Sequence, residues 1–181
     1  MPALPSNPLV LFLDIDGVLH PEGVGADLEF YHLDNFQTVL RQFPAVRVVV
    51  SSTWRLSMSL EVLRHHFAVD IQNRIVGVTP DLRSIHPPPG LRQRECKSWI
   101  ERNCPGSSWL AIDDRKSYFD DDCPFLFLIP HVYDGGVGLD AEQAELLRQR
   151  LAAVLLREGP RPSTDLRGDV IPGPIKQDGT T

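Results

Sequence analysis

Short runs of consecutive hydrophobic residues alternate along the chain with stretches in which hydrophobic residues recur every three or four positions. The runs predict strands buried on both faces, and the periodic stretches predict amphipathic helices. We expect strands at 9–13, 47–50, 75–78, 109–112 and 125–129, helices at 33–43, 56–67 and 92–103, and a last helix between a capping Asp140 and Gly159. The alternation predicts an α/β fold, a Rossmann-like three-layer sandwich with a mainly parallel sheet.

The chain is expected to contain one domain, at residues 8–159. A length of 181 residues is enough for one sizeable core, and the sequence contains no internal repeat. We interpret residues 1–7 as an N-terminal extension. Residues 160–181 are rich in proline, glycine, aspartate and threonine without hydrophobic periodicity, so a disordered tail is expected there.

Composition narrows the range of partners and compartments. The net charge of −6 argues against general electrostatic binding to nucleic acid, although a local basic patch would still permit it. No hydrophobic stretch approaches the roughly 18 residues that span a bilayer, and no signal peptide is recognisable, so no membrane partner is expected. Cys96, Cys104 and Cys123 form no CxxC pair, and we interpret them as reduced packing residues of a cytoplasmic protein.

Polar residues gather where three of the expected strands end. The carboxyl ends of parallel strands lie at one edge of the sheet, where such folds bind ligands. Carboxylate oxygens suit Mg²⁺, which offsets the repulsion between an anionic nucleophile and an anionic phosphate, and a carboxylate can attack phosphorus. The residues concerned are Asp14, Asp16, Ser51, Ser52, Asp113 and Asp114, with the cations Arg94 and Lys97 on the helix at 92–103.

The order and spacing of these residues resemble the four motifs of the haloacid dehalogenase (HAD) superfamily. The segment FLDIDGV at 12–18 closely resembles the first motif. Ser51 after its strand resembles the second motif, Arg94 or Lys97 the third, and the pair Asp113-Asp114 the fourth. The resemblance covers roughly residues 8–156. It implies an HAD-like fold without a large cap domain, because the intervals between the motifs are too short to hold one.

The resemblance also implies a role for each acid. Asp14 would be the nucleophile that forms a phosphoaspartyl intermediate, and Asp16 would protonate the leaving oxygen and then activate water. The second acid marks phosphatases and phosphotransferases and disfavours dehalogenation. Mg²⁺ would be held by the Asp14 carboxylate, the Asp16 backbone carbonyl and the fourth-motif acids. Of those two acids, we favour Asp114 over Asp113 as the closer ligand.

Phosphate-binding residues follow from the second and third motifs. Ser51, with Ser52 beside it, would hydrogen-bond the phosphoryl group, and a cation would stabilise its charge. Arg94 has the better position for that cation, whereas Lys97 has the residue type usual in the family. The choice between them stays open at this point.

A closer resemblance is carried by SSTWR at 51–55 and IVGVTP at 75–80. Similar segments occur in a small HAD subgroup found in bacterial RNA-repair assemblies and as stand-alone proteins. Arg55 would then supply a second phosphate contact. Trp54 would be either a packing residue or a surface on which a ring stacks.

We therefore predict a Mg²⁺-dependent phosphomonoester hydrolase that acts through an aspartyl-phosphate. Without a cap, its site would be open to a bulky phosphorylated substrate, such as a nucleotide, a nucleic-acid end or a phosphoprotein, or a protein partner would supply a lid. The alternative is a non-catalytic phosphate- or nucleic-acid-binding module with the same fold. A receiver-like signalling domain is disfavoured, because its acceptor aspartate lies on a later strand.

Overall fold

The computed structural model describes residues 8–25, 28–84, 89–131, 133 and 135–158. Within these residues, parallel strands form one sheet in the order β3-β2-β1-β4-β5. The strands are β1 (Val10–Leu13), β2 (Arg47–Val50), β3 (Ile75–Val78), β4 (Trp109–Asp113) and β5 (Leu126–Leu128). The predicted α/β, Rossmann-like class with its parallel sheet is confirmed. The extension at 1–7 and the tail at 160–181 lie outside the described residues.

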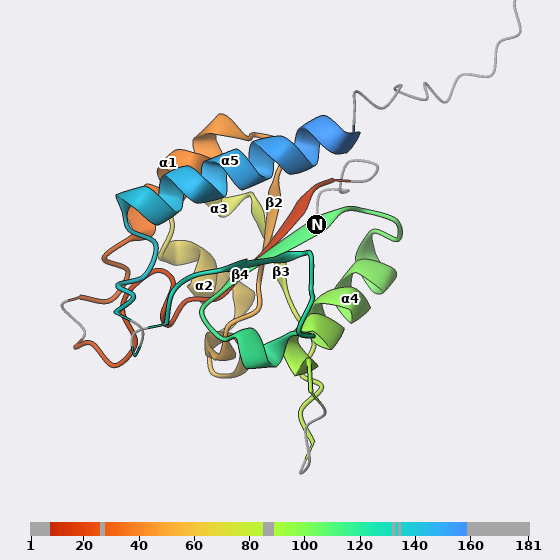
Figure 1. Ribbon diagram of the computed structural model, residues 1–181, viewed down its shortest axis with the longest axis horizontal. Helices are drawn as coiled ribbons and strands as arrows, with labels where there is room; N and C mark the ends of the chain where they lie inside the picture. Colours follow the sequence, from red (N-terminus) through yellow and green to blue (C-terminus); the bar gives the residue numbers. More distant parts are fainter. Residues whose placement is uncertain (1–7, 26–27, 85–88, 132, 134, 159–181) are drawn as a thin grey trace, which may run out of the picture.

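Helices cover both faces of the sheet, with α1 and α5 on one side and α4 on the other (Figure 1). Asp140 caps α5 as predicted, because its Oδ1 accepts a hydrogen bond from the Gln143 amide at 2.9 Å. The helices are α1 (Leu33–Gln42), α2 (Leu60–His65), α3 (Val69–Gln72), α4 (Leu91–Asn103) and α5 (Ala141–Glu158), with the 3₁₀ turns η1 (Thr53–Leu56) and η2 (Lys116–Tyr118).

The central strand β1 divides the core into two layers. Successive side chains of a strand point to opposite faces, so Leu11 and Leu13 join the cluster under α1 and α5, whereas Val10 and Phe12 join the one under α4. All four are fully buried. This is why the strand reads as an uninterrupted hydrophobic run rather than as an alternating one.

Two elements differ from the expectation. The predicted helix at 56–67 is divided into η1 and α2, because Ser59 caps a new helix by accepting a hydrogen bond from the Val62 amide at 3.3 Å. The strand predicted as buried at 125–129 is shorter and only partly covered, and Leu128 is 42% exposed. It pairs with β4 alone, so one of its edges faces outward.

The strand order places the expected site residues side by side. From β1 the chain builds β2 and β3 on one side of the sheet and then β4 and β5 on the other. β1 and β4 are paired, with Leu13 opposite Ile112, so Asp14 and Asp113 follow at adjacent strand ends. In such sheets the ligand site lies at this reversal of strand order, outside the carboxyl ends. Within the described residues, short helices, loops and β3 occupy the intervals between the motifs, and none forms a cap domain.

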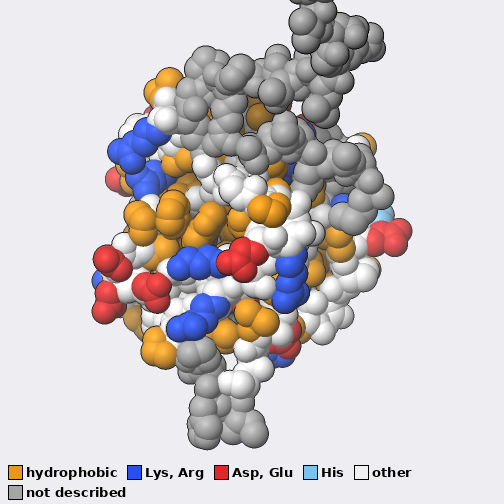
Figure 2. Space-filling view, turned by 90° about the vertical axis from the view of Figure 1, so that its right-hand side faces the viewer, with side chains coloured by type: hydrophobic (Ala, Val, Ile, Leu, Met, Phe, Trp, Pro, Cys, Tyr) orange, Lys and Arg blue, Asp and Glu red, His pale blue; other side chains and the backbone are white. Residues whose placement is uncertain are grey.

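The surface of the described residues carries mixed charge. On the side that bears α4, lysine, arginine and acidic side chains are interspersed among hydrophobic groups (Figure 2). Cys96 and Cys104 are buried, Cys123 is half-buried, and all three thiols are free. No helix in the described part of the chain is long and apolar enough to cross a membrane.

Candidate active site

Three buried carboxylates meet at the carboxyl edge of the sheet. Asp14 follows β1, Asp113 ends β4 and Asp114 comes next. Each offers one oxygen to a group whose members all lie within 4.8 Å of one another, and the three residues are no more than 5% exposed. Carboxylates at this spacing repel each other strongly, so the arrangement requires a compensating cation.

Gly17 permits the close approach of the first and fourth motifs. A Cβ atom at this position would lie 2.2 Å from Asp114 Oδ2, and the residue has a φ of +74°. Both the space and the left-handed backbone therefore require glycine here. The glycine of the FLDIDGV segment thus leaves room for the Asp114 carboxylate.

The cation inside the cluster is Arg92, the second residue of α4. Its Nη1 donates hydrogen bonds to Asp14 Oδ2 and, at 2.6 Å, to Asp113 Oδ2, and its side chain is 7% exposed. Burial by itself would lower the pKa of Arg92, but the charges of the two carboxylates raise it above its ordinary value. Arg92 therefore stays charged and offsets part of the cluster's negative charge.

The two cations expected for the third motif lie apart from the carboxylates that Arg92 contacts. Arg94 and Lys97 are exposed on the outer face of α4, where Arg94 Nε donates to the Pro89 carbonyl at 3.4 Å. Arg92 shares the inner face with Cys96 and Trp99, four and seven residues further on, both of which are buried. That helical spacing was the available signal, since an arginine in line with two core residues must turn inward.

Burial also alters the acidity of the fourth-motif pair. Asp113 is fully buried, and its burial, together with the charge of Asp14, raises its pKa to about 7, although Arg92 opposes the shift. The pKa of Asp114 is raised for the same two reasons, burial first and the charge of Asp14 second. Asp114 Oδ1 is buried and has no hydrogen-bond partner among the described residues. An unpaired carboxylate oxygen in an electronegative cluster is the environment that a cation would satisfy.

Asp16 lies at the rim of the cluster, with its side chain 41% exposed. Trp54 Nε1 lies 3.1 Å from both carboxylate oxygens and donates to them, and His20 Nε2 is 3.2 Å from Oδ1. The hydrogen bond with His20 is the largest influence on Asp16 and lowers its pKa, and the bond from Trp54 acts in the same direction. Trp54 thus contributes its indole N–H as well as its packing against Phe30, with ring centroids 5.2 Å apart.

The two serines after β2 differ in what they offer. Val50 pairs with Leu13, so Ser51 and Asp14 follow at adjacent strand ends. Ser51 is 1% exposed, and its Oγ has no hydrogen-bond partner among the described residues. Ser52 caps η1, because its Oγ accepts a hydrogen bond from the Trp54 amide at 3.4 Å. Ser51 therefore has a hydroxyl without any partner among the described residues, whereas the Ser52 oxygen is already used as a helix cap.

Arg55 is held inside the protein rather than aimed at a ligand. Its Nε, Nη1 and Nη2 donate to the carbonyls of residues 51, 52, 79 and 80 and, at 2.6 Å, to Glu95. These bonds use all five guanidinium donors. Arg55 thus braces the loop that carries Ser51, and all the guanidinium donors expected for a phosphate contact have partners within the protein.

A comparison with known protein families matches residues 10–144 to the HAD domain in Swiss Army Knife RNA repair proteins. The chain belongs to this family. The match confirms the predicted resemblance, and it runs from the start of β1 into α5, so it includes every strand of the sheet. Neither the comparison with curated proteins nor the one with solved structures gives a match.

Residues 18–25, which follow β1 and which we call the flap, contact the fourth-motif loop at Arg115 and the loop after β5 at His131. Glu22 forms an ion pair with Arg115, and His131 Nε2 lies 3.4 Å from Glu22 and 3.5 Å from Asp114 Oδ2. His32 Nε2 lies 2.6 Å from the Val137 carbonyl. The contacts of Glu22 and His131 place the flap next to Asp114.

Proposed function

We propose that this HAD domain hydrolyses phosphomonoesters with Mg²⁺, through an aspartyl-phosphate on Asp14. The observation that carries the proposal is the group of three buried carboxylates, Asp14, Asp113 and Asp114, with Arg92 inside it and the unpaired Ser51 hydroxyl beside it. Acids for the metal, a hydroxyl and a guanidinium for the phosphoryl group, and a second acid at the rim are what the reaction requires.

The residues present fit a magnesium ion. Three carboxylates against one guanidinium leave an excess of negative charge, and hard oxygen ligands favour Mg²⁺. Asp113 already accepts hydrogen bonds from Arg92 and from the Arg115 amide, whereas Asp114 Oδ1 accepts none from the described residues. The proposed ligands are therefore Asp14, the Asp16 backbone carbonyl and Asp114, with Asp113 holding Arg92 in place. When bound, Mg²⁺ would neutralise charge on the phosphoryl oxygens and allow an anionic nucleophile to approach.

Each side chain then has a distinct task. Asp14 attacks phosphorus while Arg92 and Ser51 bind the equatorial oxygens. Trp54 and His20 favour the ionised form of Asp16, which is the form that activates water in the second step. The arriving phosphate is anionic, and a nearby like charge raises a carboxyl pKa, so substrate binding favours the protonated Asp16 needed to release the leaving group.

A phosphorylated nucleic-acid end is the substrate class that we infer. Support comes from the family, whose description concerns RNA repair proteins, and from the absence of a cap domain among the described residues. The net charge of −6 gives no general attraction for nucleic acid. Recognition would therefore depend on the end itself, held at the acidic cluster by Mg²⁺ and Arg92.

The test is release of inorganic phosphate from an aryl phosphate, from nucleotides and from oligonucleotides with 3′- or 5′-phosphates, with Mg²⁺ and with chelator. We expect metal-dependent release by the wild type. Asp14→Asn should abolish release, and Asp16→Asn should reduce it strongly. Circular dichroism of both variants checks that the fold is kept. Undiminished activity in Asp14→Asn would refute the mechanism, and no release from any substrate would favour the binding module.

A further inference from the structure

Phe30, which lies between the flap and α1, has a strained backbone. Its φ is +60°, and it is the one described residue other than glycine with a positive φ. A bulky side chain rarely adopts this conformation, and the strain persists only where the surrounding contacts hold it. The contacts that hold Phe30 therefore indicate its role.

The backbone of Phe30 fixes the tautomer of His20. The Phe30 amide donates a hydrogen bond to His20 Nδ1 at 3.2 Å, and the His20 side chain is 4% exposed. A ring nitrogen that accepts a hydrogen bond carries no proton, so neutral His20 has its proton on Nε2. Nε2 lies 3.2 Å from Asp16 Oδ1. His20 therefore donates to Asp16, and Phe30 selects the tautomer that can do so.

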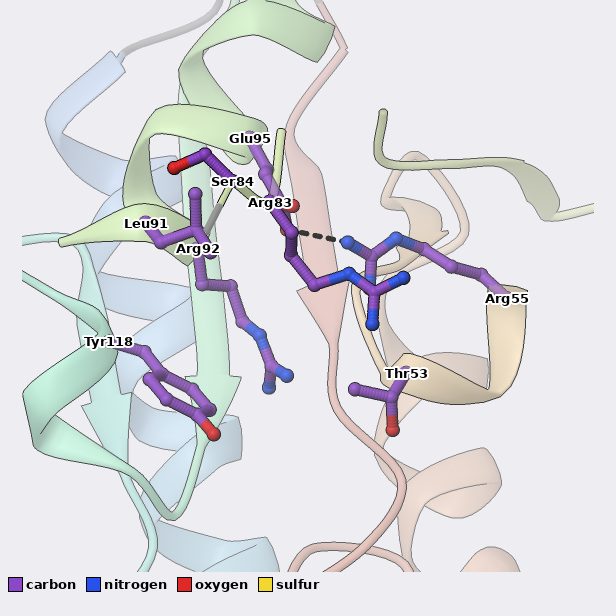
Figure 3. A pocket seen from close by; sticks show the side chains of 8 residues that line it. All are labelled: Thr53, Arg55, Arg83, Ser84, Leu91, Arg92, Glu95 and Tyr118. Carbon is purple, nitrogen blue, oxygen red and sulfur yellow. Dashed lines mark hydrogen bonds and ion pairs between the residues drawn. The ribbon is translucent and has the colours of Figure 1, made fainter. Parts of the chain in front are cut away.

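The ring of Phe30 supports the indole of Trp54, which is the second donor. The Phe30 and Trp54 rings meet edge to face, with 81° between their planes, and the Phe30 ring stacks on His66 with ring centroids 4.5 Å apart. The residue after Trp54 is Arg55, whose side chain pairs with Glu95 of α4 (Figure 3). The backbone of η1 is thus anchored through Arg55, and the Phe30 ring supports the direction of the indole.

The two donors act unequally on the oxygens of Asp16. Oδ1 lies 3.2 Å from His20 Nε2 and 3.1 Å from Trp54 Nε1. Among the described residues, Oδ2 has only the Trp54 N–H, also at 3.1 Å, and shares it with Oδ1. A hydrogen bond weakens as it departs from a straight line, so a shared N–H binds each oxygen weakly. Because the Asp16 side chain is 41% exposed, Oδ2 is the oxygen left for a substrate.

We propose that Phe30 is the positioning residue for Asp16: it keeps both donors in place on that carboxylate, so that Oδ2 meets the leaving oxygen of the phosphate ester. The inference rests on the proposed function. As Asp14 forms its bond to phosphorus and the ester P–O bond breaks, the proton on Asp16 Oδ2 passes to the leaving oxygen. Water then attacks phosphorus and gives a proton back to Oδ2, which frees the Asp14 carboxylate. A displaced Asp16 should therefore penalise the esters whose leaving oxygen most needs that proton.

The test compares phenyl phosphate with p-nitrophenyl phosphate, because the oxygen of the second leaves more readily without a proton. The parameter kcat/KM covers the steps up to the departure of that oxygen. General acid catalysis contributes about 10²–10⁴-fold, so Phe30→Leu, which removes the ring, should lower kcat/KM for phenyl phosphate about 10- to 100-fold. The loss for p-nitrophenyl phosphate should be much smaller. Phe30→Tyr keeps the ring and should keep the wild-type ratio between the two esters.

The matched control is Phe43→Leu, the same change in another partly buried phenylalanine packed against the same core cluster. It should leave the ratio unchanged, because a general loss of folded protein lowers both values alike. The inference is overturned if Phe30→Leu keeps the wild-type ratio, or if Phe43→Leu shifts the ratio as far.

A measurement on the wild type requires neither turnover nor a variant. NMR of the imidazole nitrogens should show the His20 proton on Nε2, and a proton on Nδ1 would overturn the inference. If no phosphomonoester is hydrolysed, the proposed function fails, and the indole N–H of Trp54 tests the positioning instead. Its proton should exchange with water faster in Phe30→Leu than in the wild type or in Phe43→Leu. Equal exchange in all three proteins would reject the role of Phe30.

Discussion

Replacing Arg92 with methionine should weaken both the fold and the activity. The substitution leaves Asp14 and Asp113 buried without the guanidinium that both contact. Breaking a buried ion pair from one side costs about 3–5 kcal/mol. With a urea dependence of about 2 kcal/mol/M, the unfolding midpoint should fall by roughly 1.5–2.5 M. Domains have about 5–15 kcal/mol of stability, so a loss of this size leaves all but the least stable of them folded, and the urea curve shows whether the variant can be assayed.

The matched controls are Arg94→Met and Lys97→Met, which change exposed cations of the same helix. Their unfolding free energies should stay within about 0.5 kcal/mol of the wild type. In phosphate release, Arg92→Met should lose about 10²–10³ in kcat, and the two controls should retain activity. Mg²⁺ and Arg92 offset the same carboxylates, so MgCl₂ should recover part of the lost stability in Arg92→Met. The reasoning fails if Arg94→Met or Lys97→Met is as damaging, or if Arg92→Met unfolds like the wild type.

Three further predictions concern the surrounding contacts. Trp54→Phe keeps an aromatic ring but removes the N–H that donates to Asp16. We expect kcat to fall about tenfold or more with KM little changed. A change in KM alone would contradict this prediction. Gly17→Ala places a methyl group against the Asp114 carboxylate. Calorimetry should detect weaker Mg²⁺ binding, and the free energy of unfolding should fall by at least about 1 kcal/mol. A Mg²⁺ affinity equal to that of the wild type would refute the predicted clash. The carboxyls of Asp113 and Asp114 hold protons more tightly in the folded protein, so the stability of the metal-free protein should decline as pH rises from about 4 to about 7. Mg²⁺ binds the ionised carboxylates, so differential scanning fluorimetry should show a larger increase in Tm with Mg²⁺ at pH 8 than at pH 5.5. A larger increase at pH 5.5 would refute this prediction.

The positions of the acids were predictable because they depend on local pattern. A hydrophobic run predicts a buried parallel strand, and parallel strands place their carboxyl ends at one edge of the sheet. Asp14, Asp113 and Ser51 therefore come together without any knowledge of loop conformation. The close approach of Gly17 to Asp114 was not predictable in this way, because it depends on how β1 lies against β4.

Three side chains were harder to place because their partners are distant in sequence. Trp54 reaches an acid 38 positions away, and Arg55 reaches Glu95 at a separation of 40. An exposed tryptophan and a solvated arginine are equally compatible with the local sequence. Arg92 was overlooked because Arg94 and Lys97 fit the motif spacing, although its alignment with the buried Cys96 marked the inner face of α4.

By itself, the sequence determined the α/β class, the strand ends that carry the acids and the family to which the chain belongs. These features follow from hydrophobic periodicity and from motifs in which neighbouring residues act together. Only the tertiary structure decided that Arg92 offsets part of the charge of the acidic cluster, that Arg55 braces a loop and that Trp54 donates to Asp16. A buried charge must find its partner in space, and the packing of α4 and η1 against the sheet selects which side chain is within reach.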